Sequence, residues 1–436
     1  SGDKFYYPNK LETRGGNRVP WFKCACCPSN SARFFSSVSK YLYATSGDSL
    51  IVGLYAESTA EVQFAGKTVK ISQETDYPWS GEIRIRIDPA KPETFNLALR
   101  IPGWAVNRPV PGDLYRHGKT DNPIVTLQVN SEPVRRIATP GYVDTKRSWT
   151  KGDVVKLNLP MPVRRVESNK LLLDNAGLVA LERGPLVYCI EGVDIGKKTE
   201  QLNLRIDPKA TFKAEHRENL LGGVTVLKGK AMEVSRGADK VSVVEKKIPI
   251  VAVPYYARAN RDVTSMVVWM LADKARAILP PRPDVASTSR ITASIEKGQF
   301  AALNDQITPV RSGDASRGRF IWTGKRGTSE WVQYDFKKPA EVSAVEVYWY
   351  ARFGTGEKLP ESWKLMYRDG GEFKPVEPKG AYGVKPDQFN RVAFKPVKTD
   401  ALRLTVKLQD KYVETYLEKN AKPKKMSAGI LEWRVE

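Results

Sequence analysis

The chain has 436 residues, of which 41% are hydrophobic and 27% are charged, and its formal net charge is +21. This hydrophobic content excludes wholesale disorder, and the lack of an 18-residue apolar run excludes a membrane-spanning helix. The positive charge does not indicate nucleic-acid binding, because lysine and arginine are dispersed and alternate with apolar residues, as in Ile83–Ile87. The length predicts about three domains.

One helix is predicted near the start of the chain, over Ser31–Thr45. The apolar residues that repeat there at helical spacing are Ala32, Phe35, Val38 and Leu42. Pro28 precedes this stretch, and Ser29 or Asn30 could cap the helix. Cys26 and Cys27 are therefore expected just before a helix N-terminus, where the helix dipole favours negative charge.

Short strands separated by turn residues are predicted after this helix. They are Leu50–Tyr55, Glu61–Phe64, Glu82–Ile87, Phe95–Ile101 and Val154–Leu159, and a similar series runs from Gly177 to Met270. This spacing is typical of β-sandwiches. The proline-rich segment Leu279–Asp284 is predicted to be a linker. The unit after it is again all-β, with its clearest strand at Val342–Tyr350.

Three of the four cysteines fall within four positions, at Cys24, Cys26 and Cys27. Thiols this crowded are typical of metal ligation or nucleophilic chemistry. The alternative is that they are incidental packing thiols. The fourth, Cys189, lies in a strand-like run and is interpreted as a small buried hydrophobic residue.

The chain resembles the C-terminal half of the β-L-arabinofuranosidase family of glycoside hydrolases (family 127 and its relatives). Five separate motifs carry the resemblance over residues 1 to about 275, and they fall in the family's order. They are Tyr7–Glu12, Trp21–Asn30 with Arg33, Leu99–Trp104, Leu181–Tyr188 and Pro254–Ala257.

The resemblance implies a mainly β fold that follows the end of an (α/α) six-barrel. Residues 1–46 would be the last segment of the catalytic barrel, residues 47–160 the first β-sandwich and residues 161–278 the second. Residues 287–436 resemble a discoidin or coagulation-factor-type C domain, a jelly-roll β-sandwich. The greater part of the barrel would lie upstream, so the chain is expected to need a missing barrel half, for which a separate polypeptide is one interpretation.

The same resemblance implies a zinc- and cysteine-dependent site. Cys26 would be the catalytic nucleophile and also contact zinc, and Cys27 would be a second zinc ligand. The family's other ligands, in a Glu-x-Cys motif, and its glutamate acid/base would lie upstream, since this chain has no Glu-x-Cys. Cys24 could substitute as a ligand. Arg33 could contact substrate or pair with a carboxylate of the barrel.

In the jelly roll, Asp305 and Glu432 are candidate calcium ligands, because calcium prefers hard oxygen donors. Gln306 stands where related domains have glycine, which is a departure from their pattern. Trp322, Trp349 and Tyr350 could stack on a sugar, although core packing is at least as good an interpretation. His117 and His216 lie in polar sequence and are expected at the surface.

Together these features predict part of a retaining glycosidase for β-L-arabinofuranosides or related plant-wall sugars, inactive by itself. The alternative is a non-catalytic carbohydrate-binding assembly of β-sandwiches. A periplasmic or secreted location is expected from the sugar-binding-like domain, with the cytoplasm as the alternative.

Overall fold

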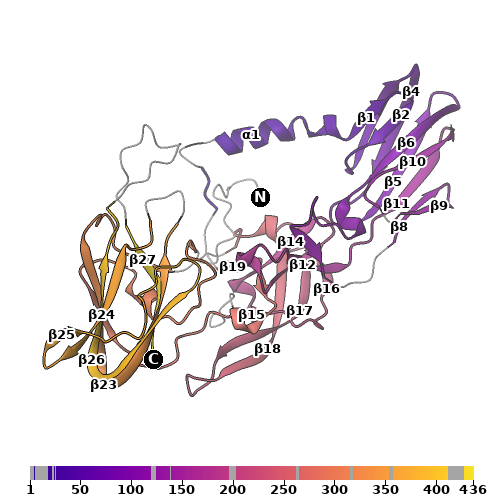
Figure 1. Ribbon diagram of the computed structural model, residues 1–436. Coiled ribbons are helices and arrows are strands. Elements are labelled where there is room, and N and C mark those ends of the chain that lie inside the picture. The colour runs from indigo at the N-terminus through magenta and orange to yellow at the C-terminus, as the bar shows by residue number, and fades with distance from the viewer. Residues whose placement is uncertain are drawn as a thin grey trace. The chain divides into compact units, whose positions relative to one another are not determined.

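The structure is a computed structural model. It describes residues 4, 18–21, 24, 26–118, 124–137, 139–195, 203–261, 265–314, 318–352, 357–410 and 427–436. The chain divides into two compact units (Figure 1): residues 1–235 with 245–277, and residues 236–244 with 278–436. Both units are built mainly of strands, as the sequence predicts. No helix within the described ranges is long and apolar enough to cross a membrane.

The N-terminal helix begins earlier and is shorter than the sequence pattern predicts. Helix α1 spans Cys26–Phe35, and after a 3₁₀ turn the chain enters strand β1, Tyr43–Ser46. The prediction of a helix over 31–45 was therefore wrong at both ends. The hydroxyls of Ser36 and Ser37 donate hydrogen bonds to the carbonyls at the end of α1, including that of Arg33. Serines that compete for these carbonyls end the helix there.

The first β domain consists of two facing sheets. Glycine or polar residues stand in the turns that connect its strands. The four-stranded sheet has the order β1, β2 (Ser49–Val52), β6 (Glu93–Ile101) and β10 (Gly141–Trp149). The six-stranded sheet has the order β3 (Ser58–Phe64), β4 (Lys67–Glu74), β5 (Glu82–Pro89), β11 (Asp153–Asn158), β8 (Val125–Val129) and β9 (Glu132–Ile137).

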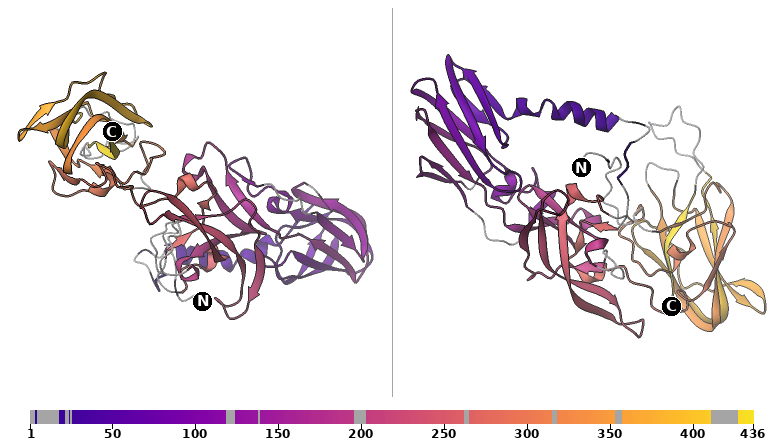
Figure 2. Two further views of the ribbon diagram at one scale, coloured as in Figure 1. Left: turned by 90° about the horizontal axis from the view of Figure 1, so that it is seen from below. Right: turned by 180° about the vertical axis from the view of Figure 1, so that it is seen from behind.

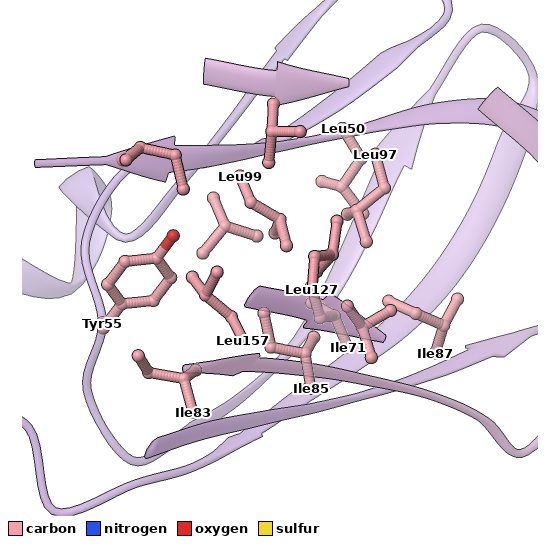
Figure 3. Close-up of a cluster of buried hydrophobic side chains, with 14 of the residues drawn as sticks. Leu50, Tyr55, Ile71, Ile83, Ile85, Ile87, Leu97, Leu99, Leu127 and Leu157 are labelled. Atoms are coloured by element: carbon pink, nitrogen blue, oxygen red, sulfur yellow. The ribbon is translucent and has the colours of Figure 1, made fainter. Parts of the chain in front are cut away.

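Alternation of side chains along the strands builds the core between these two sheets. In β5 the isoleucines at 83, 85 and 87 are buried, whereas Arg84 and Arg86 face solvent. Figure 3 shows Leu97 and Leu99 of β6 above the β5 isoleucines. Leu97 has no exposed surface, so its side chain lies entirely within this core.

The second β domain is a ten-stranded sheet whose pairings return to their starting strand. The path β14–β18–β17–β15–β20–β13 closes because β13 also pairs with β14. Buried residues such as Leu181, Ile190 and Met270 form one of its cores. The strands are β12 (Val163–Ser168), β13 (Leu178–Arg183), β14 (Leu186–Glu191), β15 (Leu204–Arg205), β16 (Lys213–Arg217), β17 (Val224–Arg236), β18 (Val243–Pro254), β19 (Met266–Val267) and β20 (Met270–Leu271), with β7 (Tyr115–His117) at the edge.

The second unit is a seven-stranded sheet built around two long strands, β23 (Ser329–Tyr350) and β26 (Phe389–Lys407), seen from two further sides in Figure 2. Register shifts near Asp335 and Val342 mark bulges where β23 bends. Buried tryptophans fill the core. The other strands are β21 (Arg290–Ala293), β22 (Phe320–Ile321), β24 (Ser362–Asp369), β25 (Glu372–Pro375) and β27 (Gly429–Val435).

Replacing a leucine in the first core tests this packing against a matched control. Leu97→Ala should lower the free energy of unfolding by about 2–5 kcal/mol, because it removes buried methyl groups and leaves a cavity. Leu171→Ala makes the same chemical change at a side chain that is 87% exposed, and it should change stability by less than about 0.5 kcal/mol. Urea unfolding followed by circular dichroism measures both. Equal effects would contradict the assigned core.

Candidate functional site

The three crowded thiols lie together at the start of α1. Cys26 is the first residue of the helix and Cys27 the second. The Sγ atom of Cys24 donates a hydrogen bond to Sγ of Cys26 at 3.6 Å, and the Sγ atoms of Cys26 and Cys27 are 3.9 Å apart. All three residues are exposed, whereas Cys189 is buried. Burial raises the pKa of the Cys189 thiol, so Cys189 is a packing residue, as predicted.

Helical spacing places two further motif residues on the side of α1 that carries Cys26. Asn30 follows Cys26 by four residues and Arg33 follows it by seven, and such residues lie on one helix face. Arg33 is exposed and belongs to the last turn of α1. It therefore lies about two turns, or roughly 10 Å, along the helix from Cys26.

The geometry of the thiols suits two ligands of one zinc ion. Two sulfurs that each lie about 2.3 Å from a tetrahedral zinc are about 3.8 Å from each other, and Sγ of Cys26 and Sγ of Cys27 are 3.9 Å apart. In the described part of the chain, no group of three or more His, Cys, Asp or Glu side chains is arranged to hold a metal ion. The cysteine pair thus fits part of a zinc site and needs further ligands.

The structure also brings together the two carboxyl groups named for calcium. Glu432, in β27, is 1% exposed and accepts a hydrogen bond from the backbone N–H of Gln306 at 3.1 Å. Burial, and next the neighbouring carboxyl of Asp305, raise the pKa of Glu432 to about 9. Gln306 has φ of 60°, which favours glycine and explains the glycine of related domains.

Several other residues named from the sequence lie in cores. Trp322, Trp349 and Tyr350 are at most 1% exposed, so their rings pack inside the second unit and offer no surface to a sugar. His216 is exposed as expected. The expectation for His117 was wrong, because its side chain is only 2% exposed.

Residues 7–12, the first family motif, and residues 22, 23 and 25 of the second lie outside the described residues.

His117 belongs to a buried polar cluster that joins the two β domains of the first unit. Its Nε2 lies 3.3 Å from Oε2 of Glu182, and its Nδ1 lies 3.1 Å from Nη1 of Arg164. Arg164, which is 3% exposed, also donates from Nη1 to the carbonyl of Trp104 in the first domain. Burial lowers the pKa of Arg164, and Glu182 opposes this shift. The cluster is a structural junction.

Comparison with protein families now assigns the domains. Residues 49–161 match the β-L-arabinofuranosidase GH127 middle domain, residues 163–271 the glycoside hydrolase family 127 C-terminal domain, and residues 286–418 the F5/8 type C domain. The chain carries the middle and C-terminal domains of glycoside hydrolase family 127. It is homologous to β-L-arabinofuranosidases, as its motifs indicate.

Individual relatives agree with this assignment. The chain is 30% identical over 300 residues to a non-reducing end β-L-arabinofuranosidase of Bifidobacterium longum, which covers 62% of this chain and 42% of the relative. A solved GH127 β-arabinofuranosidase superimposes with a TM-score of 0.60 at 36% identity, over 64% of this chain and 44% of the other. A GH127 β-L-arabinofuranosidase from Geobacillus stearothermophilus T6 gives a TM-score of 0.54 at 37% identity, over 62% and 42%. The chain thus spans less than half the length of these relatives.

The three later family 127 motifs meet at the junction of the two β domains. Leu99–Trp104 supplies the carbonyl that Arg164 binds, and Leu181–Tyr188 supplies Glu182. Pro254–Ala257 supplies Tyr256, whose hydroxyl accepts a hydrogen bond from Nε1 of Trp79 at 3.0 Å. The guanidinium of Arg18 donates to the carbonyl of Tyr256 at 2.8 Å, which ties the N-terminal segment to the same place.

Removal of the Arg164 guanidinium tests the junction. Arg164→Ala leaves the carbonyl of Trp104 and Nδ1 of His117 without their donor and should lower the free energy of unfolding of the first unit by about 1–3 kcal/mol. Arg116→Ala is the matched control, because it breaks the exposed pair with Glu167 one strand away and should cost about 1 kcal/mol or less. Urea unfolding measures both variants, and equal losses would show that the buried cluster is not a stabilising junction.

Proposed function

We propose that this chain is the C-terminal portion of a retaining glycoside hydrolase that acts on β-L-arabinofuranosides or related plant-wall sugars. The observation that carries the proposal is the pair Cys26–Cys27 in the first turn of α1, in a chain that carries two family 127 domains. The curated relative named above is a non-reducing end β-L-arabinofuranosidase, which supports the substrate class.

The sulfur of Cys26 would act as the nucleophile. Its thiolate would attack the anomeric carbon of the sugar while the bond from that carbon to the leaving oxygen breaks. Water would then attack the same carbon and return the electron pair to the sulfur. Each step inverts the configuration, so the product keeps the configuration of the substrate. The positive end of the helix dipole at Cys26 stabilises the negative sulfur.

Cys26 and Cys27 would hold zinc, which keeps bound thiols deprotonated at neutral pH. A general base for the nucleophile is then unnecessary. Arg33, on the same face of α1 as Cys26, would contact the substrate two turns away. A general acid/base and the remaining zinc ligands would come from residues outside this sequence.

The surface of α1 supports the need for a barrel half. None of the ten residues of α1 is buried, and Phe34, Phe35 and Tyr41 are 53%, 71% and 61% exposed. Aromatic side chains exposed on α1 and on the 3₁₀ turn after it, which carries Tyr41, indicate a surface that another element covers. A barrel half, on the same or a separate polypeptide, would cover them. The chain alone would lack the acid/base and would be inactive.

Activity measurements with an aryl β-L-arabinofuranoside test this proposal. The chain alone should give no turnover, and mixing with a barrel half from a family member should restore it. Cys26→Ala should then lower kcat by at least roughly 10³-fold, because the nucleophile is lost. Cys189→Ala, which removes a thiol from the core, should retain activity.

Two outcomes would contradict the account. Turnover by the chain alone that Cys26→Ala abolishes would disprove the need for a barrel half. Turnover by the mixture that survives Cys26→Ala would disprove the role of Cys26.

We also propose that Asp305 and Glu432 bind calcium with backbone oxygens of the second unit. Without metal, stability should fall as pH rises from about 4.5 towards 9, because the folded Glu432 keeps a proton that the unfolded chain releases. Calcium replaces that proton, so it should raise the melting temperature more at pH 8 than at pH 5.

Glu432→Gln should abolish the calcium effect. Glu436→Gln, at an exposed carboxylate four residues on, should retain it. Differential scanning calorimetry with and without calcium measures these shifts. A melting temperature that calcium leaves unchanged at pH 8 would contradict the site.

A further inference from the structure

Cys24 is the one residue of the thiol cluster that the proposed chemistry leaves without a role. Its Sγ donates a hydrogen bond to Sγ of Cys26 at 3.6 Å, and both residues are exposed. A disulfide has an S–S length of about 2.05 Å. The two sulfurs therefore need to approach by about 1.6 Å to bond.

The helix constrains Cys27 in such an approach and does not include Cys24. Cys26 and Cys27 are adjacent residues of α1, and joining neighbours would close a strained ring within the first helical turn. Cys24 lies outside the helix. Pro28 keeps it there, because a proline ring inside a helix clashes with the carbonyl four residues before it. Cys24 can therefore move towards Cys26 without the loss of a helical hydrogen bond.

We propose that Cys24 and Cys26 form a reversible dithiol–disulfide pair in which Cys24 is the resolving thiol. The oxidant is a peroxide. The Cys26 thiolate attacks one peroxide oxygen, forms a sulfenic acid and releases hydroxide. The Cys24 thiolate then attacks the Cys26 sulfur, forms the S–S bond and releases a second hydroxide. The two thiol protons convert the hydroxides to water, and the pair has lost two electrons.

This pair would regulate the proposed site, and in that respect the inference rests on the proposed function. A Cys26 sulfur bonded to Cys24 has no thiolate with which to attack a sugar or to bind zinc. Oxidation would switch the site off, and a dithiol reductant would restore it. Such control is relevant in an oxidising compartment, such as the periplasmic or secreted location expected from the sequence.

Thiol counting and peptide mass mapping of the full chain after exposure to hydrogen peroxide test the inference. The wild type should lose two of its four thiols and two hydrogen atoms of mass, with a link between Cys24 and Cys26, and dithiothreitol should reverse the change. Cys27→Ser should behave in the same way. Cys24→Ser should form no internal disulfide, and dimedone should trap its Cys26 sulfenic acid.

Two results would contradict the proposed disulfide between Cys24 and Cys26. One is an internal disulfide of the same yield in Cys24→Ser, and the other is a wild type that forms only disulfides between chains. The three cysteines are exposed, and unchanged circular dichroism confirms that the variants fold. The measurement uses no substrate, zinc or barrel half. A negative result in the activity tests therefore does not contradict the disulfide between Cys24 and Cys26. Likewise, the absence of that disulfide does not contradict the proposed activity.

Discussion

Pro28 imposes the constraint on which the cysteine site depends. A proline has no backbone N–H, so a helix tolerates it in its first turn, where that N–H has no partner within the helix, and rejects it further along. Since Pro28 is the third residue of α1, the helix must begin close to Cys26. This start places the sulfurs of Cys26 and Cys27 at the positive end of the helix and leaves Cys24 outside it. The same start places Asn30 and Arg33 in line with Cys26.

A second constraint is the burial of charge between the β domains. Arg164 contacts a carbonyl of one domain and His117 of the other, and His117 in turn lies beside Glu182. Buried charged groups are costly unless hydrogen bonds compensate them, so the bonds of Arg164 to both domains favour one arrangement of the two. The family motifs at this junction are thus explained by architecture. The chemistry that we propose involves the motif around Cys26.

Much of the fold could be predicted because strand alternation is a local property of the sequence. The isoleucines of β5 and the run in β23 show it directly. The extent of α1 was mispredicted because apolar periodicity continues past Phe35, while serine hydroxyls and strand pairing of Tyr43 with Val52 end the helix. His117 was misplaced because the sequence around it is polar. Its burial depends on Arg164 and Glu182, 47 and 65 residues away.

Only those residues of the candidate site that are adjacent in the sequence could be predicted to act together. The pair Cys26–Cys27 could be named from the sequence, because adjacent thiols before a proline are a local signal. The contact between Cys24 and Cys26, and that between Asp305 and Glu432, depend on backbone geometry and on pairing between distant segments. The sequence indicates the burial of Arg164 only weakly. Arg164 and Arg165 are adjacent in an alternating strand, so one of the two must face inwards.

The zinc-to-protein ratio of this chain, measured alone and after mixing with a barrel half of the family, tests the central claim most directly. The account predicts that the chain alone retains no zinc and that the mixture retains one ion per complex, because Cys26 and Cys27 supply two ligands of a site completed from elsewhere. Tight binding of zinc by the chain alone would contradict this, and would indicate a closed structural site rather than a divided catalytic one.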